Sequence, residues 1–388
     1  MSDVAVVSAR GAGRWQRGHP WIFKSDVVEL PAGPPGVVTV RERNGRPLGL
    51  ALWSPASEIS LRLLDRDAEA TINSAWWEAR LRVALDRRDA VSRKATAYRV
   101  VHAEGDALPS LVVDRYDRSV VVQFMSAGLE SRRGEVIDAI RHVLEPEGIL
   151  ARNDVSLRKR EGLAEGVELL HGDVPRTIEI EEHGIHYIAA PWDGQKTGAF
   201  LDQRENRAAI GHVSCGRALD VFAYHGSFAL HLARGAREVI ALDSSAHALE
   251  RARQNAALNG FAHVQTVEAD AFEWLREAER AREKFDTIAL DPPAFAKNKP
   301  SLASALRGYK EINLRAMRIL APGGHLFTAS CSFHLSKGGF LDMLQEAAQD
   351  SGRRLALRGI YGQPEDHPEV IGIPETGYIK GAMLEALD

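Results

Sequence analysis

The chain is poor in cysteine and has no long apolar run, and both absences restrict what it can be. Two cysteines among 388 residues cannot form a disulfide framework, which makes the cytosol the expected compartment. No stretch of about 18 apolar residues is present to span a membrane. The first residues also lack the charged, apolar and small-residue segments of a signal peptide. We therefore expect a cytoplasmic protein with no membrane partner.

Length and charge indicate a multidomain chain. With 388 residues, of which 45% are hydrophobic, it is too large for one ordinary core. The net charge of -4 is unevenly distributed, because the first 100 residues carry a basic excess and the remainder an acidic one. An anion-binding N-terminal module would explain this difference, and so would chance clustering of charges on solvated surfaces. Charge alone does not establish a nucleic-acid partner.

Residues 1–68 predict a small β-barrel. Short alternating strands are separated by turn-forming residues, among them Asn44-Gly45, a strong hairpin signal between apolar segments. Basic and aromatic side chains are interleaved near the start of this region. Such a mixture suits RNA, because guanidinium groups hold phosphates and rings stack on bases. Residues 21–23 (WIF) more simply fill the barrel, so the RNA contacts are assigned to Arg14, Arg17 and Lys24.

Residues 69–190 predict an α+β domain that connects the barrel to the rest of the chain. Near-helical spacing of apolar residues indicates helices at 71–90 and 133–144. The strand-like segments are 98–102, 110–113, 120–124, 148–152, 167–170, 177–182 and 185–189. This domain is the second of three predicted parts.

Residues 191–388 predict an α/β domain of the Rossmann-like type. Five apolar runs each end in a polar cluster, and the segments between them are long enough for helices. This rhythm is typical of a parallel sheet wound with helices, in which ligands bind at the carboxyl ends of the strands. The runs are 218–222, 238–242, 264–267, 287–290 and 325–329.

The first three strand ends carry acidic side chains that suit a nucleotide-like ligand. Gly226 lies where the turn after Asp220 enters a helix, so the backbone there can approach a ligand closely. Asp243 is placed to accept the hydroxyl groups of an adenosine ribose, or else it caps the helix near Ser245. Asp270 either accepts a hydrogen bond from an adenine amino group or caps the helix that follows it. The recurrence at successive strands favours a ligand site.

The last two strand ends carry the most distinctive chemistry. Two prolines after Asp291 fix the backbone and end a buried strand, which leaves the carboxylate in the crevice and Phe295 available to stack on a base. A turn without a ligand is the simpler alternative. Cys331 follows the fifth run, where a nucleophile would lie, although lone cysteines are more often inert and buried. Cys215, before the first run, is expected to be such a buried residue.

The chain resembles a known family of RNA methyltransferases. The motif series of class I S-adenosylmethionine-dependent RNA methyltransferases is matched by 197–207 (TGAFLDQRENR), 220–228, 291–293 (DPP) and 330–332 (SCS). More narrowly, these residues resemble the bacterial 23S ribosomal RNA large subunit methyltransferase I family, which makes 5-methylcytosine. Residues 17–23 (RGHPWIF) resemble that family's N-terminal PUA domain, and 106–116, 152–155 and 161–163 resemble its middle domain.

The resemblance implies a cofactor, a substrate and roles for individual residues. The cofactor would be S-adenosylmethionine and the substrate RNA, in particular 23S ribosomal RNA, with no metal. Cys331 would be the nucleophile that adds to carbon 6 of cytosine, and Asp291 would bind the pyrimidine edge. The implied cofactor contacts are Asp202, Gln203, Arg204, Asp220, Phe222, Tyr224, Gly226, Asp243, Ser244, Asp270, Ala271 and Asp291. Many RNA cytosine methyltransferases have a second cysteine in the Asp291 motif, which is missing here, so the acceptor of the carbon 5 proton stays unassigned.

Three other functions remain open at this point. Transfer to a guanine nitrogen would make Cys331 structural, but it usually comes with an Asn-Pro-Pro-Tyr motif at the Asp291 position. A nicotinamide-dependent enzyme would also use Asp243, but the GxGxxG pattern is absent and Asp-Pro-Pro is present. The third alternative is a non-catalytic RNA-binding protein with a vestigial pocket. Formation of a homodimer is left open as well.

Overall fold

The computed structural model describes residues 4–296 and 299–388, apart from the side chain of Lys299. The chain divides into two compact units, each assembled from three separate stretches of sequence. The first unit comprises Met1–Ile180, Ala189–Leu201 and Glu365–Gly377. The second unit comprises Glu181–Ile188, Asp202–Pro364 and Tyr378–Asp388. The three-domain division at residues 68 and 190 stays a prediction.

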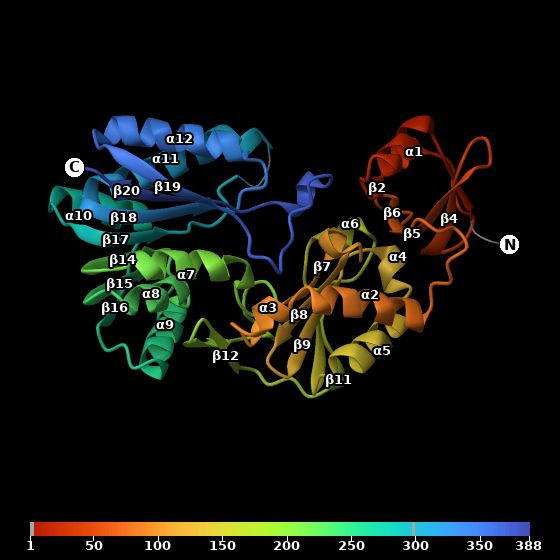
Figure 1. Ribbon diagram of the computed structural model, residues 1–388, viewed down its shortest axis with the longest axis horizontal. Helices are drawn as coiled ribbons and strands as arrows, with labels where there is room; N and C mark the ends of the chain where they lie inside the picture. Colours follow the sequence, from red (N-terminus) through yellow and green to blue (C-terminus); the bar gives the residue numbers. More distant parts are fainter. Residues whose placement is uncertain (1–3, 297–298) are drawn as a thin grey trace. The chain divides into compact units, whose positions relative to one another are not determined.

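The N-terminal part of the first unit is a six-stranded sheet with the strand order β2-β6-β5-β4-β1-β3 (Figure 1). Its strands are β1 (Val4–Val7), β2 (Trp21–Ile22), β3 (Val27–Glu29), β4 (Gly36–Glu42), β5 (Pro47–Trp53) and β6 (Leu61–Asp65). β4 and β5 pair antiparallel on either side of Asn44-Gly45, so the predicted hairpin is confirmed. Ile22, Val38 and Leu61 are buried in the core of this sheet.

The prediction of strands alone over residues 1–68 is wrong at α1 (Ala9–Gln16). The helix begins at Ser8, whose Oγ accepts a hydrogen bond from the Gly11 N–H at 3.2 Å, as N-cap serines commonly do. Trp15 anchors it, because this side chain is only 1% exposed and belongs to the core of the sheet. The short helix η1 (Lys24–Asp26) follows β2. Of the residues expected to fill the barrel, Ile22 is buried, whereas Trp21 and Phe23 are half-buried.

The rest of the first unit is built around a five-stranded sheet with the order β11-β10-β9-β8-β7. Its strands are β7 (Ala97–His102), β8 (Leu111–Tyr116), β9 (Ser119–Phe124), β10 (Gly148–Arg152) and β11 (Val167–Gly172). The helices are α2 (Ser74–Asp86), α3 (Asp89–Ser92), η2 (Ala103–Asp106), α4 (Ala127–Glu130), α5 (Arg133–Leu144) and α6 (Leu157–Arg160). Trp77 of α2 and Ile140 of α5 are fully buried in the same core as the strands, which gives the predicted α+β arrangement. A separate two-stranded sheet consists of β12 (Ile178–Glu182) and β13 (Ile185–Ala189), of which Glu181–Ile188 belong to the second unit.

The second unit contains a seven-stranded sheet with the order β16-β15-β14-β17-β18-β20-β19. Its strands are β14 (Arg217–Val221), β15 (Glu238–Asp243), β16 (Val264–Glu268), β17 (Phe285–Leu290), β18 (Leu320–Ser330), β19 (Leu355–Tyr361) and β20 (Lys380–Ala386). The five predicted runs are the five parallel strands, β14 to β18. β20 pairs antiparallel with both β18 and β19, and neither β19 nor β20 was predicted.

Helices cover both faces of this sheet, which explains why the central parallel strands are mainly apolar and buried (Figure 1). They are η3 (Leu201–Gln203), α7 (Arg204–Val213), α8 (Ser227–Ala233), α9 (Ala246–Leu258), α10 (Ala271–Arg280), η4 (Lys299–Ser301), α11 (Leu302–Ile319) and α12 (Lys337–Ser351). Leu219, Ile288 and Leu326 are fully buried under α11 and α12. The strand ends, where the chain turns toward the helices, are the places at which polar side chains can meet a ligand.

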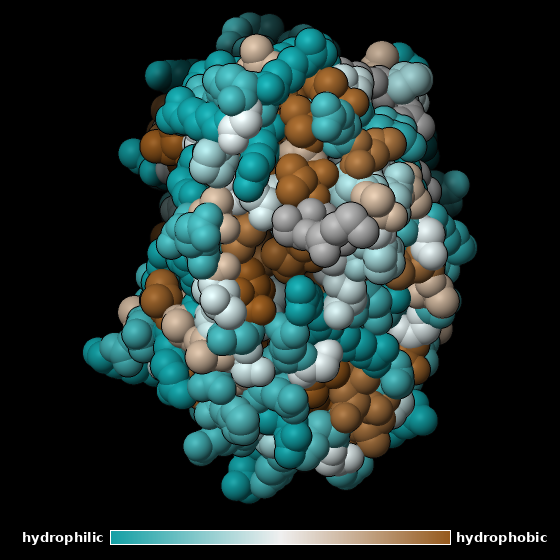
Figure 2. All heavy atoms as spheres, turned by 90° about the vertical axis from the view of Figure 1, so that its right-hand side faces the viewer, coloured by the Kyte–Doolittle hydropathy of each residue, from teal (hydrophilic) through white to brown (hydrophobic). Residues whose placement is uncertain are grey.

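The surface shown in Figure 2 is mainly hydrophilic, and hydrophobic side chains gather there only in small groups. Most of the large apolar side chains lie instead in the cores of the sheets, although a few, such as Leu30, Phe333 and Ile371, are exposed. Within the described residues, no helix has the length and apolar character that crossing a bilayer requires.

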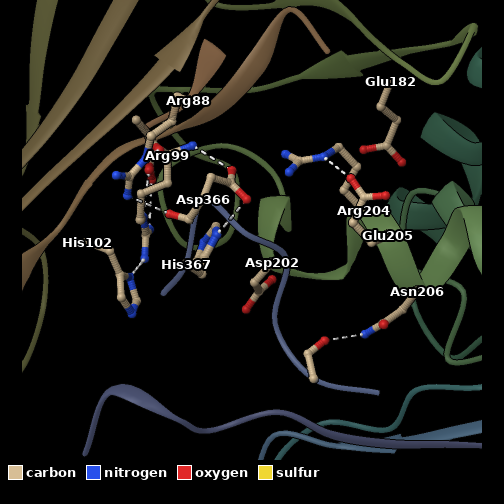
Figure 3. Close-up of polar contacts among 12 residues, drawn as sticks. Arg88, Arg99, His102, Glu182, Asp202, Arg204, Glu205, Asn206, Asp366 and His367 are labelled. Carbon is tan, nitrogen blue, oxygen red and sulfur yellow. Dashed lines mark hydrogen bonds and ion pairs between the residues drawn. The ribbon is translucent and has the colours of Figure 1, made fainter. Parts of the chain in front are cut away.

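A buried ionic cluster attaches Glu365–Gly377, which includes η5 (Pro374–Thr376), to the first unit (Figure 3). The guanidinium group of Arg88 donates to both carboxylate oxygens of Asp106 at 2.6 Å and to the backbone oxygen of Asp366 at 3.0 Å. The Asp366 carboxylate in turn accepts the Arg99 N–H at 3.0 Å. Asp366 is fully buried and lies 278 residues beyond Arg88 in the sequence. A distant part of the chain therefore completes the core of the first unit.

Candidate active site

The predicted site residues gather at the carboxyl edge of the second unit's sheet. Asp220 and Asp243 lie at the ends of the adjacent parallel strands β14 and β15. Asp291 directly follows β17, and Cys331 directly follows β18, which is the parallel neighbour of β17. Because parallel strands end at the same edge, these four side chains share one rim of the sheet.

The turn between β14 and α8 has the strained backbone of a ligand-binding loop. Phe222, Tyr224 and Gly226 have φ values of 66°, 49° and 79°, a left-handed region that non-glycine residues rarely adopt. Asp243 holds this turn, because one of its carboxylate oxygens accepts the Tyr224 N–H at 2.9 Å and the other accepts the Ser245 N–H at 2.9 Å. At Gly226 a Cβ atom would approach the Cβ of Ala252 to 2.9 Å, so a larger residue would displace α9.

Asp220 is a buried carboxyl group beneath this turn. It is 1% exposed, and its Oδ2 accepts the Ala229 N–H at 2.8 Å. Its Oδ1 has no hydrogen-bond partner among the described residues. Burial, together with the nearby carboxylates of Asp291 and Asp243, raises the pKa of Asp220 to about 8. A buried oxygen without a donor is the feature expected where a bound molecule supplies the missing hydrogen bond.

The segment before α7 is connected to the Asp291 loop. Gln203 donates from Nε2 to the Asp291 Oδ1 at 2.9 Å, and Asn206 donates to the Gln203 Oε1 at 2.5 Å. The Tyr378 hydroxyl donates to the Asp202 Oδ2 at 2.8 Å. Arg204 is fully buried and donates to Glu205 at 3.1 Å (Figure 3). These bonds fix the orientation of the two acidic side chains at this part of the rim.

A tyrosine joins the Asp291 loop to the Cys331 loop. The hydroxyl of Tyr309, on α11, lies 2.8 Å from the Ser332 Oγ and accepts the Phe295 N–H at 3.3 Å. The Ser332 Oγ also accepts the Ala296 N–H at 3.1 Å. Burial raises the pKa of Tyr309, and the neighbouring Cys331 contributes in the same direction. The half-buried Cys331 is therefore held close to the loop that carries Asp291.

The remaining predicted contact residues differ in how they are placed. Asp270 is exposed and caps α10, because its Oδ1 accepts the N–H groups of Phe272 and Glu273 at 2.9 and 3.0 Å. Ser244 is exposed and Ala271 is buried. The ring of Phe295 lies 4.6 Å from that of Tyr309. Contacts of these residues with a ligand stay predictions.

The predicted RNA-binding side chains of the first unit are not equally available. The Arg14 guanidinium lies 4.5 Å above the ring of Phe23 and 3.9 Å from the carboxylate of Asp26. Arg17 and Lys24 are exposed. Arg17 and Lys24 are therefore better placed than Arg14 to reach a phosphate group.

The expectation for Cys215 is wrong. This cysteine is exposed, and its N–H donates to the Thr287 Oγ1 at 3.1 Å. It lies in the connection between α7 and β14, two residues before β14 begins at Arg217. The expectation failed because the burial of β14 does not extend back to the residue that leads into it.

Several buried polar residues of the second unit were missed from the sequence. Arg207 donates to both oxygens of Glu182 at 2.5 and 2.6 Å, and His231 lies 2.9 Å from the same carboxylate. Despite burial, Arg207 and His231 hold the pKa of Glu182 far below its usual range. Tyr309, Tyr378 and Lys380 were missed as well. Only Arg207 had a signal, because it ends the motif at residues 197–207.

Comparisons with known proteins agree with this arrangement. A family model for S-adenosylmethionine-dependent methyltransferases matches residues 99–376, and a PUA-like domain model matches residues 6–66. Proteins named Ribosomal RNA large subunit methyltransferase I are similar over almost the whole chain. The one from Aeromonas salmonicida is 39% identical over 95% of this chain and 96% of its own, and the one from Shewanella amazonensis is 40% identical over 95% of both.

Solved structures show the same fold. A SAM-dependent methyltransferase from Streptococcus mutans superimposes with a TM-score of 0.83 over 99% of this chain and all of its own, at 21% identity. The methyltransferase SMU.776, solved in complex with SAH, gives a TM-score of 0.85 over the same shares at 22% identity. The PUA-like domain and the class I methyltransferase fold are thus confirmed. Taken with the sequence relatives, the chain is an S-adenosylmethionine-dependent methyltransferase and belongs to the Ribosomal RNA large subunit methyltransferase I family.

Proposed function

We propose that this chain methylates carbon 5 of a cytosine in RNA, and that the RNA is the 23S ribosomal RNA of the large ribosomal subunit. The observation that carries the proposal is the placement of Cys331 after β18, joined through Ser332 and Tyr309 to the loop of Asp291. A thiol and a carboxylate side by side are what carbon 5 chemistry requires. The names of the relatives support ribosomal RNA as the substrate.

The donor set of the second unit fits S-adenosylmethionine. The buried Asp220 Oδ1 lacks a donor within the described residues, and the strained turn up to Gly226 brings backbone close to the rim. When bound, S-adenosylmethionine supplies an electrophilic methyl group. The residues proposed to hold it are Asp202, Gln203, Arg204, Asp220, Phe222, Tyr224, Gly226, Asp243, Ser244, Asp270, Ala271 and Asp291.

Cys331 is proposed to activate the base. Carbon 5 of cytosine is a poor nucleophile, so the Cys331 thiolate adds to carbon 6, and the electron pair of the 5,6 double bond makes carbon 5 nucleophilic. Once carbon 5 carries the methyl group, a base removes its proton. The electron pair left behind restores the double bond and expels the sulfur as thiolate. The base must leave its stack for the sulfur to reach its face, as in other enzymes that act on nucleobases.

The Asp291 carboxyl group is proposed to accept a hydrogen bond from the cytosine amino group and to share a proton with N3, where negative charge develops as the thiolate adds. Gln203 holds the Asp291 Oδ1 at 2.9 Å, so the carboxylate is oriented before the base enters. Such preorganisation is worth more than a hydrogen bond formed only during the reaction. The proposed catalytic pair is therefore Cys331 and Asp291.

Mass spectrometry of digested RNA tests the proposed product. The protein is incubated with unmodified 23S ribosomal RNA and methyl-labelled S-adenosylmethionine, and the nucleosides are separated. We expect the label in 5-methylcytidine and at a single cytosine, which should also be unmethylated in cells that lack the protein. Label in a methylguanosine would contradict the proposal, and cofactor binding without any transfer would favour a non-catalytic RNA-binding protein.

The RNA contacts proposed for Arg14, Arg17, Lys24 and Phe295 lead to a prediction about salt. Replacing Arg17 and Lys24 together with alanine should weaken RNA binding and reduce the slope of log affinity against log salt by about 1 to 2, since each lost phosphate contact removes about 0.7 to 0.9. Filter binding between 50 and 300 mM salt measures the slope. Arg93→Ala is the control, because Arg93 is exposed and pairs with Asp89 on α3. An unchanged slope in the double variant would remove both residues from the RNA surface.

A further inference from the structure

Lys380 is a buried amine at the start of β20, next to the cysteine loop. Its residue is 5% exposed, and its backbone lies opposite Ser330 in the antiparallel pair of β18 and β20. Its Nζ donates to the backbone oxygen of Ser332 at 2.6 Å and to that of Tyr378 at 2.8 Å. A side chain with donors alone, bound at short distance to two carbonyl oxygens, is stabilised in its ammonium form.

The position of the Ser332 oxygen limits how far this charge lies from Cys331. Covalent geometry between adjacent residues, added to the 2.6 Å hydrogen bond, places the Lys380 Nζ within about 9 Å of the Cys331 Cα. Inside a protein, charges at such a distance interact appreciably, because little water lies between them. A cation there favours a neighbouring thiolate over a thiol.

The charged and titratable groups on the neighbouring elements do not supply that stabilisation; on the cysteine segment itself lie the half-buried His334 and the exposed Lys337. Asp291 and Asp202 are acidic and oppose a thiolate, and the raised pKa of Tyr309 keeps its hydroxyl neutral. Arg207 is bound to Glu182 at 2.5 and 2.6 Å. The groups in question are Asp291 after β17, Asp202 in η3, Arg207 in α7, Tyr309 in α11 and Tyr378 before β20. Lys380 is a buried cation that hydrogen-bonds the residue directly after Cys331.

We propose that Lys380 is a positioning residue that holds the Cys331 loop against β20 and favours the Cys331 thiolate. The inference rests on the proposed function, because it assigns Cys331 the role of nucleophile. It extends that function by naming the group that prepares the sulfur for attack. Tyr378 lies two residues before Lys380, and its hydroxyl binds Asp202, one of the residues proposed to hold the cofactor. Residues 378–380 therefore contact both the loop of Cys331 and the cofactor site.

Alkylation of the two cysteines as a function of pH tests the proposal without RNA or cofactor. Iodoacetamide is added to the full chain between pH 6 and 10, and the labelled peptides are quantified by mass spectrometry. The exposed Cys215 serves as an internal reference in every sample. Lys380→Gln removes the charge but keeps a hydrogen-bond donor, and Lys380→Arg keeps the charge.

We expect the midpoint of Cys331 alkylation in Lys380→Gln to rise by about one pH unit, the size that Coulomb's law gives for unit charges roughly 10 Å apart at an effective dielectric constant near 20. Lys380→Arg and the Cys215 midpoints should stay within a few tenths of a unit of the native values. Methylation by Lys380→Gln should fall about tenfold at pH 7 and recover toward pH 9, since a smaller fraction of the thiol is ionised. An unchanged Cys331 midpoint in a folded Lys380→Gln variant would overturn the proposal.

If Lys380→Gln does not fold, the native chain decides the question. A Cys331 midpoint below that of Cys215 supports a nearby stabilising cation, and a midpoint at or above it overturns the proposal. Failure of the proposed function is seen separately, as methylation that persists when Cys331 itself is replaced.

Discussion

Replacing Cys331 with alanine is expected to abolish methyl transfer, with a loss of at least about 10⁴-fold, because carbon 5 cannot be activated without a sulfur at carbon 6. Binding of S-adenosylmethionine should stay within about twofold of the native value, since Cys331 is not among the residues proposed to hold the cofactor. Transfer of labelled methyl groups to RNA measures the first quantity, and isothermal titration calorimetry measures the second.

Cys215→Ala is the matched control, because it removes the other, exposed thiol and should leave the rate unchanged. RNA that contains 5-fluorocytidine gives an independent signal: the fluorine cannot leave as the proton does, so the RNA should stay covalently attached to Cys331. Turnover that survives in Cys331→Ala would rule out the adduct and favour transfer to a guanine nitrogen.

Replacing Asp220 with asparagine is expected to make the protein more stable at pH 8 than the native chain, by about 5 kcal/mol, while cofactor affinity falls. The pKa of Asp220 is raised from 3.8 to about 8 by burial and by the carboxylates of Asp291 and Asp243. Between these two values the folded state binds more protons at this site than the unfolded state, so the contribution of Asp220 to stability falls as pH rises from about 4 to about 8. An asparagine has no proton to lose and avoids this loss.

The measurement is the thermal unfolding midpoint of both proteins at pH 4, 6 and 8. The midpoints should be similar near pH 4 and diverge progressively toward pH 8, with the variant higher. Asp270→Asn is a useful comparison, because Asp270 is exposed and caps a helix rather than lying in the core. If the difference in unfolding midpoint between the native protein and Asp220→Asn does not change with pH, the pKa of Asp220 is not raised in the folded state.

The parallel strands β14, β15, β17 and β18 could be predicted because most of their residues are buried and therefore give apolar runs, whereas the edge strand β16 is only partly buried and was found from its place in the rhythm. The strands β19 and β20 were not predicted. β20 follows its partner β18 only after a long intervening segment, and β19 has no apolar pattern of burial, because its Leu357 and Ile360 are more than half exposed. The helix α1 has the sequence ARGAGRWQ, whose two glycines disfavour a helix. The Ser8 cap and the burial of Trp15 overcome that preference, and neither is visible as a periodic pattern.

The same reasoning explains what was found of the site. Asp220, Asp243, Asp291 and Cys331 could be placed from the sequence, because the topology of a parallel sheet brings strand ends together. Tyr309, Tyr378 and Lys380 could not be placed, because a tyrosine in a helix and a lysine in a strand have no signature until the tertiary contacts exist. The exposed Cys215 shows the opposite error, in which residue type alone suggested a burial that the local backbone does not provide.

The capture of Asp366 by Arg88 and Arg99 has a consequence for biosynthesis. During translation most domains fold in order, as each emerges from the ribosome. Asp106 and Asp114 pair the two guanidinium groups within the N-terminal half, but the Arg99 backbone N–H gains its Asp366 acceptor only after residue 366 has been synthesised. The first unit therefore reaches its final set of contacts only when almost the whole polypeptide has been made, since Glu365–Gly377 belongs to it.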